Sequence, residues 1–120
     1  MGLQIAERKS GSVTILDLVG RIVIGVSNDS LGTELRRLGE LGPAEVIVNL
    51  AGVAQMDSSG ISTLVRSFVS LERTGGGLKL LNPTGHVRDV LELTRLINAI
   101  PTFTDEAKAV AAFRGGLAHA

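Results

Sequence analysis

The sequence predicts an α/β fold: one domain with a mixed, mostly parallel β-sheet of four to five strands and about four α-helices. Residues 46–48 are β-branched and apolar without alternation, as in a strand that is covered on both faces. From residue 27 onward, short apolar runs alternate with segments of helical periodicity, which implies crossovers between parallel strands. At 120 residues, the chain can bury one core and leaves no room for a second domain.

The chain opens with a predicted hairpin. Residues 3–9 and 13–19 alternate loosely between apolar and polar side chains, and Ser10-Gly11-Ser12 separates them. After Gly20-Arg21, the apolar run at 22–24 either extends the second strand or forms a further short strand. The hairpin therefore adds antiparallel strands at one side of the sheet.

A first helix is expected next, ending at Gly42-Pro43. Its candidate N-caps are Ser27, Asn28 and Asp29, because their side-chain oxygens can accept bonds from first-turn N–H groups. Leucines at helical spacing form its expected buried stripe: Leu31, Leu35, Leu38 and Leu41.

The centre of the predicted fold is a strand at 46–50, a loop closed by Asp57-Ser58-Ser59-Gly60 and a helix to Leu71. The helix has its apolar residues at helical spacing: Ile61, Leu64, Val65, Phe68 and Leu71. Asp57 or Ser58 alone would be a sufficient N-cap. Gly60 in the first turn costs roughly 1 kcal/mol relative to Ala, so we expect another group to approach its backbone closely. The loop follows the carboxyl end of a strand, where α/β sheets bind ligands and partners.

The second half continues the alternation. A strand is expected at 78–81, and a helix follows whose buried stripe comprises Val87, Val90, Leu91 and Thr94. A last strand is expected at 102–103. Thr104 is expected to cap a final helix with Val110, Ala111 and Phe113 inside, and residues 115–120 are expected to fray, leaving 1–114 ordered.

Composition excludes several classes of protein. The 12 basic and 12 acidic residues cancel, so no broad cationic field attracts nucleic acid or an anionic membrane. The absence of Cys excludes disulfides and thiolate metal sites, and no other ligand cluster has metal-binding spacing. The most apolar stretch, 13–26, is interrupted by Asp17 and Arg21 and is too short to span a bilayer. We expect a soluble cytoplasmic protein without metal or cofactor and without direct membrane insertion.

Enzymatic motifs are missing as well. Gly75-Gly76-Gly77 lacks the Lys and helix of a phosphate-binding loop. The only histidines, His86 and His119, are expected on a helix surface and in the tail, so neither serves as a base for a serine nucleophile. Asp105-Glu106 is explained by a helix N-terminus. The sequence therefore predicts no catalytic residues and a protein that is not an enzyme.

A receiver domain is a second candidate of this length, because Asp57 follows a central apolar strand. A receiver also requires an acidic pair after its first strand to hold Mg²⁺. The first two predicted strands here end in Ser-Gly-Ser and Val-Gly-Arg, which disfavours this interpretation.

Along nearly its whole length, the chain resembles the anti-sigma-factor antagonists, the single-domain bacterial members of the STAS family. The resemblance is centred on residues 49–60, which match the family's strand, loop and Asp-Ser-Ser/Thr-Gly signature. Val19-Gly20-Arg21 and the segments 75–80 and 87–91 fall where comparable segments fall in that family. The resemblance implies a STAS-like sandwich of sheet and helices over residues 1–120.

The resemblance also implies a mechanism. Ser58, the first serine of the signature, would be phosphorylated by an anti-sigma factor with serine kinase activity and dephosphorylated by a serine phosphatase. The unphosphorylated form would bind the anti-sigma factor, free a sigma factor and so regulate transcription. The expected switch loop and partner-binding surface comprise Asp57, Ser58, Ser59, Gly60, Ile22, Val23 and Ile24.

One departure concerns the segment after Gly20. Many relatives carry an acidic residue shortly after this glycine, whereas here Arg21 and the apolar run 22–24 follow. These apolar residues are either a docking surface or, as is usual for strand residues, buried. The competing functional class is a STAS module that is not phosphorylated and serves as a scaffold or as a cytoplasmic accessory subunit of a membrane transporter.

Overall fold

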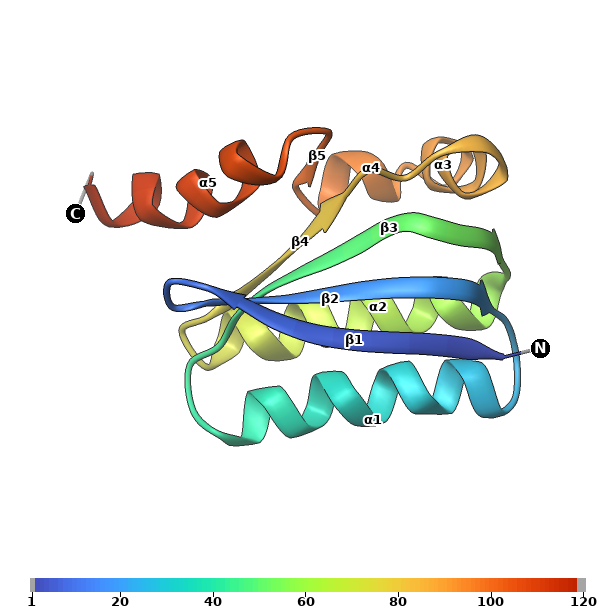
Figure 1. Ribbon diagram of the computed structural model, residues 1–120, viewed down its shortest axis with the longest axis horizontal. Helices are drawn as coiled ribbons and strands as arrows, with labels where there is room; N and C mark the ends of the chain where they lie inside the picture. Colours follow the sequence, from blue (N-terminus) through green and yellow to red (C-terminus); the bar gives the residue numbers. More distant parts are fainter. Residues whose placement is uncertain (1, 119–120) are drawn as a thin grey trace.

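The computed structural model describes residues 2–118, and it describes their side chains except at 26–28 and 114–118. This part of the chain forms five strands and five helices (Figure 1). They are β1 (Leu3–Ser10), β2 (Val13–Ile22), α1 (Val26–Glu40), β3 (Glu45–Met56), α2 (Ser58–Arg73), β4 (Gly77–Leu81), α3 (Gly85–Leu93), α4 (Leu96–Ala99), β5 (Thr102–Phe103) and α5 (Glu106–Ala118).

The strands form one sheet in the order β1-β2-β3-β4-β5. The β1 strand is antiparallel to β2, and each further pair is parallel. This arrangement confirms the predicted α/β class with a mostly parallel sheet and an antiparallel hairpin at one side.

Both faces of the sheet are covered, but unequally. The buried residues of α1 to α4 share one core cluster with Leu16, Val46 and Val48. Those of α5 belong to a smaller cluster with Val13 and Ile47. Figure 1 shows α1 and α2 side by side on one side of the sheet and α5 on the opposite side. Because successive strand residues point to opposite faces, a strand buried in both clusters is apolar without alternation, as predicted for β3.

Irregular pairing lets β2 and β3 end side by side. The register between them shifts after Asp17 and again after Gly20, which is the signature of a β-bulge. At the first shift the backbones come close, because a Cβ on Gly52 would lie 2.6 Å from the carbonyl oxygen of Leu18. The strands remain paired through Ile22 and Met56. The loops that follow them therefore leave the same edge of the sheet together.

The first helix differs from its prediction at both ends. Its N-cap is Gly25, which has a φ of 105° and makes no side-chain capping bond. Asp29 lies inside the first turn, and the side chains of Ser27 and Asn28 lie outside the described residues. Leu41 is 76% exposed because the helix ends before it, whereas the other three predicted leucines are buried.

The segment after β4 is also divided differently. Val90 is only half-buried and Thr94 is exposed, since Thr94 is the C-cap of α3. The chain then turns through Arg95, whose φ of 61° is left-handed, and starts the short helix α4. The strand predicted at residues 102–103 is confirmed as β5.

The final helix begins one residue later than predicted. The Asp105 carboxylate accepts hydrogen bonds from the N–H groups of Ala107 (2.8 Å) and Lys108 (3.3 Å), so Asp105 rather than Thr104 caps it. On its buried side Ala109 replaces the predicted Ala111, which is exposed. The helical backbone continues to Ala118, beyond the predicted ordered boundary at 114, and residues 119–120 lie outside the described residues.

Candidate functional site

The Asp57 carboxylate organises the junction between β3 and α2. Asp57 is extended, with φ −107° and ψ −174°, and it is the N-cap of α2. Its Oδ1 accepts hydrogen bonds from the N–H groups of Ser59 (2.9 Å) and Gly60 (3.3 Å) and from the Ser59 hydroxyl. Its Oδ2 accepts one from the N–H of Ile24 at 2.9 Å. One side chain therefore caps the helix and holds the β2–α1 loop. Of the two predicted caps, Asp57 and Ser58, the structure uses Asp57.

These bonds keep Asp57 ionised. The Ser59 hydroxyl, followed by the Ile24 amide and the other amides, lowers the pKa of Asp57 below its ordinary value, because each donor favours the charged form. A fixed negative charge therefore lies within the loop at neutral pH.

The two serines of the signature have different environments. The hydroxyl of Ser59 donates a hydrogen bond to the carboxylate of Asp57. Ser58 is exposed, and among the described residues its hydroxyl has no hydrogen-bond partner. Ser58 therefore offers the accessible hydroxyl of this loop.

Gly60 is explained by close packing. It is buried, and a Cβ there would lie 2.8 Å from Cγ2 of Ile22, 2.9 Å from Cγ of Met56 and 3.1 Å from the carbonyl oxygen of Ile22. The prediction that another group approaches its backbone is confirmed, and that group is the end of β2. The same approach allows the N–H of Asp57 to donate to the carbonyl of Ile22 at 3.2 Å.

The apolar run beside the loop divides into three environments. Ile22 is fully buried, Val23 is half-buried, and Ile24 is 80% exposed. The predicted apolar docking surface therefore contains one largely exposed side chain, Ile24. It lies next to the signature loop because its N–H binds Asp57.

The exposed face of α2 extends from Ser58. Ser62, Val65 and Val69 follow at spacings of four, three and four residues, and Val65 and Val69 are 38% and 44% exposed. Val65 belongs to the predicted set of apolar residues at helical spacing, whereas Val69 does not. The sequence signal that could have identified this exposed pair is the i, i+4 spacing of Val65 and Val69, which offsets them from the centre of the apolar stripe of this helix.

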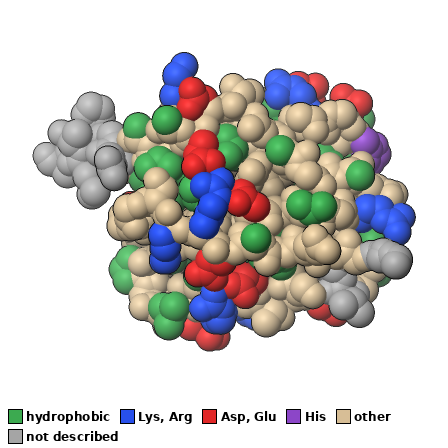
Figure 2. Space-filling view, in the orientation of Figure 1, with side chains coloured by type: hydrophobic (Ala, Val, Ile, Leu, Met, Phe, Trp, Pro, Cys, Tyr) green, Lys and Arg blue, Asp and Glu red, His purple; other side chains and the backbone are tan. Residues whose placement is uncertain are grey.

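The surface charge is mixed on the side of the molecule that Figure 2 displays. Lys and Arg side chains lie next to Asp and Glu side chains there, with hydrophobic side chains scattered among them. Within residues 2–118, no three His, Cys, Asp or Glu side chains gather as a metal ion requires. In the same range, every helix is too short or too polar to cross a lipid bilayer.

Comparisons with known proteins give a consistent picture. The sequence model of the STAS domain matches residues 4–109. No curated protein sequence is significantly similar to this chain.

Three solved proteins represent the structural matches. An anti-sigma factor antagonist from Mycobacterium paratuberculosis superposes with a TM-score of 0.81 at 18% identity, over 94% of this chain and 95% of that chain. The anti-sigma factor antagonist SpoIIAA of Bacillus, in its unphosphorylated form, superposes with a TM-score of 0.70 at 20% identity, over 95% of this chain and 99% of that chain. Its phosphorylated form superposes with a TM-score of 0.69 at 20% identity, over 92% of this chain and 98% of that chain. A sulfate transporter family protein from Wolinella succinogenes superposes with a TM-score of 0.69 at 20% identity, over 88% of this chain and 87% of that chain. At these identities the similarity establishes a common fold.

Proposed function

Because the chain belongs to the STAS domain family, we propose that it is an anti-sigma-factor antagonist that is switched by phosphorylation of Ser58. The unphosphorylated protein binds an anti-sigma factor that is a serine kinase, and the released sigma factor directs transcription. Phosphorylation by that kinase ends binding, and a serine phosphatase restores it.

The observation that carries the proposal is the difference between the two serines. A kinase must bring an acceptor hydroxyl in line with the phosphoryl group of its nucleotide, which requires an accessible oxygen. Ser58 is exposed at the first turn of α2, whereas the Ser59 hydroxyl is bound to Asp57. Ser58 is therefore the better acceptor.

The charge of the loop explains how a phosphate would act as a switch. Phosphoserine carries about −1.5 to −2 charges at neutral pH, and Asp57, one residue away, is already ionised. The helix N-terminus offsets this repulsion by typically 0.3–1 kcal/mol. Burying such a group unpaired in an interface costs several kcal/mol, and each 1.4 kcal/mol is tenfold in affinity. Binding can therefore be lost without any refolding.

The structural relatives support the same proposal. Two of the three are anti-sigma factor antagonists, and one of these has been solved in both the unphosphorylated and the phosphorylated form. This chain superposes on the two forms about equally well, with TM-scores of 0.70 and 0.69. A local switch of charge, rather than a change of fold, agrees with that similarity.

The test compares three variants in calorimetric titrations against the cognate anti-sigma factor. Ser58→Ala keeps the surface neutral and should retain most of the affinity while abolishing phosphorylation. Ser58→Asp adds one charge and should lose on the order of 1–3 kcal/mol of binding free energy. Ser59→Ala is the matched control, since it should still be phosphorylated. Equal affinities for Ser58→Ala and Ser58→Asp, or phosphate mapped to Ser59, would refute the switch.

We also propose that the protein is a substrate and not an enzyme. The purified chain should neither hydrolyse ATP nor transfer its phosphate without a kinase. ATPase activity that persists through purification and is present in the Ser58→Ala variant would contradict this proposal.

The second candidate is an unphosphorylated accessory module of a membrane transporter. The similarity to the Wolinella sulfate transporter family protein favours it. Stable co-purification with membrane subunits, combined with the absence of phosphate on Ser58 in cells, would decide for this alternative.

A further inference from the structure

A groove of about 520 Å³ lies between α1 and α2, on the flanks of the two helices that face each other. It is distinct from the phosphorylation loop, since Ser58 does not line it. Its lining comprises Gly32, Leu35, Arg36, Gly39 and Glu40 of α1 and Thr63, Arg66, Ser67, Ser70 and Leu71 of α2. This volume lies within the roughly 300–1,000 Å³ range of small-molecule sites.

Two glycines keep the groove open without a structural need for them. A Cβ on Gly32 would meet its nearest neighbours at 3.6 and 3.7 Å, and one on Gly39 would lie 3.4 Å from the flexible end of Leu71. Neither glycine has a positive φ. Each therefore destabilises the helix interior relative to Ala without relieving a clash. Gly60, by contrast, is required by the packing of Ile22.

The charges in the groove favour an anion. Arg36 and Arg66 both line it, and neither forms an ion pair with another described residue. Within the described part of the chain, the guanidinium of Arg36 donates only to the Thr33 hydroxyl, at 3.2 Å. Glu40 is the single acidic group of the lining, so two cations face one anion.

The uncharged lining supplies the remaining contacts that a ligand needs. The buried side chains of Leu35 and Leu71 give the groove an apolar floor. Ser67 and Ser70 add hydroxyl groups that can donate hydrogen bonds to an oxyanion.

We propose that this groove binds a small organic anion, with a carboxylate or phosphate head held by Arg36 and Arg66 and an apolar body on Leu35 and Leu71. Guanidinium groups match both heads, because they donate two parallel hydrogen bonds to such oxygens. The site lies outside the proposed phosphorylation switch and does not depend on it.

The short apolar floor of the groove favours a small ligand over a protein segment. The lining of α1 runs from Gly32 to Glu40, which is about 12 Å or roughly two turns. A docked partner helix normally presents anchors over two or more turns along an extended apolar groove. Here the apolar floor consists of two leucines between charged and hydroxyl groups, which suits a compact amphiphile.

Titrations of the isotope-labelled protein with octanoate and with octyl phosphate test the proposal by NMR. Saturable shifts of amides in α1 and α2 around Gly32 and Gly39 are expected, and the tighter of the two probes identifies the head group. The same apolar body without the negative charge, in 1-octanol and octylamine, should bind about tenfold more weakly or worse.

Two double variants locate the site. Arg36→Gln with Arg66→Gln should weaken both anionic probes about tenfold or more, whereas Arg88→Gln on α3 is the control and should change nothing. Gly32→Ala with Gly39→Ala should raise the melting temperature and still lower probe affinity, which separates binding from folding.

Four results would overturn the proposal. The first two are the absence of saturable binding by either anionic probe at millimolar concentration, and binding of 1-octanol as tight as that of the anionic probes. The other two are unchanged probe affinity in the double arginine variant, and amide shifts in the groove that depend on protein concentration without a probe. The last result would assign the groove to a second copy of the chain.

Discussion

At the scale of single residues, Gly60 has the strictest local requirement in the candidate site. Its replacement by Ala places a methyl group 2.8 Å from Ile22 and 2.9 Å from Met56, so one of these buried side chains must move. We expect Gly60→Ala to lower the free energy of unfolding by about 1–3 kcal/mol, despite the better helix propensity of Ala. Urea denaturation of the purified variant measures this change.

Gly32→Ala is the matched control for Gly60→Ala, because both glycines lie in helices and neither has a positive φ. Its added methyl group meets only ordinary contacts, so this variant should be more stable than wild type by up to about 1 kcal/mol. If the two variants have the same stability, the packing of Ile22 does not constrain Gly60.

The residues of the site were only partly predictable. Asp57 was a candidate cap, because cap chemistry depends on local sequence. The bond from the Ile24 amide to Asp57 joins residues 33 positions apart, and no local pattern reports it. Which serine hydroxyl binds Asp57 depends on side-chain rotamers, which the tertiary structure determines.

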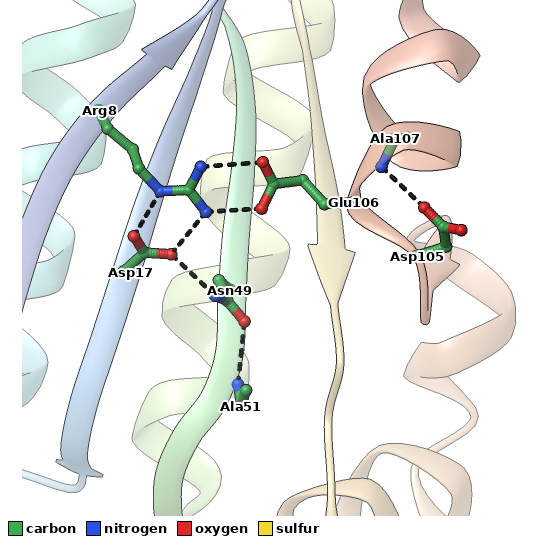
Figure 3. Close-up of polar contacts among 7 residues, drawn as sticks. All are labelled: Arg8, Asp17, Asn49, Ala51, Asp105, Glu106 and Ala107. Carbon is green, nitrogen blue, oxygen red and sulfur yellow. Dashed lines mark hydrogen bonds and ion pairs between the residues drawn. The ribbon is translucent and has the colours of Figure 1, made fainter.

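At the scale of secondary-structure elements, Arg8 joins β1, β2 and α5. Figure 3 shows its guanidinium between the carboxylates of Asp17 and Glu106. Arg8 donates to Asp17 at 2.6 and 3.2 Å and to Glu106 at 2.6 and 2.9 Å. The network continues onto β3, because Asn49 donates to Oδ1 of Asp17 at 2.8 Å and accepts from the Ala51 amide at 3.1 Å. This cluster connects a helix late in the chain to the opening hairpin.

We predict that Arg8→Ala destabilises the protein by up to about 2 kcal/mol, because it removes two partly exposed ion pairs of up to about 1 kcal/mol each. Amide hydrogen exchange should increase in α5, which loses its anchor to β1. Arg88→Ala is the control, since it removes one exposed i, i+4 pair within α3 and should cost about 0.3–0.5 kcal/mol. Unchanged exchange in α5 would mean that apolar contacts alone hold this helix.

Elements were easier to predict than their ends. The order of strands and helices followed from apolar periodicity, which each segment carries in its own sequence. The N-cap of α1 could not be read in this way, because Gly25 caps through backbone conformation while three better cap residues follow it. The break between α3 and α4 at Arg95 was missed for a similar reason, since a left-handed Arg is rare.

At the scale of the whole molecule, the sequence predicted the layers but not how they share the sheet. Alternation of strands and helices requires parallel crossovers, and the sheet has them. That α5 covers the opposite face from α1 to α4 depends on the apolar residues at the start of β2, which lie about a hundred residues away in the chain. The groove between α1 and α2 is likewise a property of two packed helices. The two glycines of α1 that line it, Gly32 and Gly39, do not predict it from the sequence of that helix alone.

The last prediction concerns stability in acid. Arg8 lowers the pKa of Asp17 and of Glu106 below their ordinary values, and the Ser59 hydroxyl lowers that of Asp57. A carboxylate with a lowered pKa in the folded state stabilises the protein fully above its unfolded value of about 4, and this contribution is lost as the pH falls through the folded pKa. The free energy of unfolding should therefore decrease steadily as the pH falls below about 4. Urea denaturation at a series of pH values measures the decrease.

The double variant Asp17→Asn with Glu106→Gln should be less stable than wild type at neutral pH and lose less stability in acid, because two of the titrating groups are gone. Equal slopes for the double variant and wild type would mean that the Arg8 cluster contributes nothing to acid sensitivity.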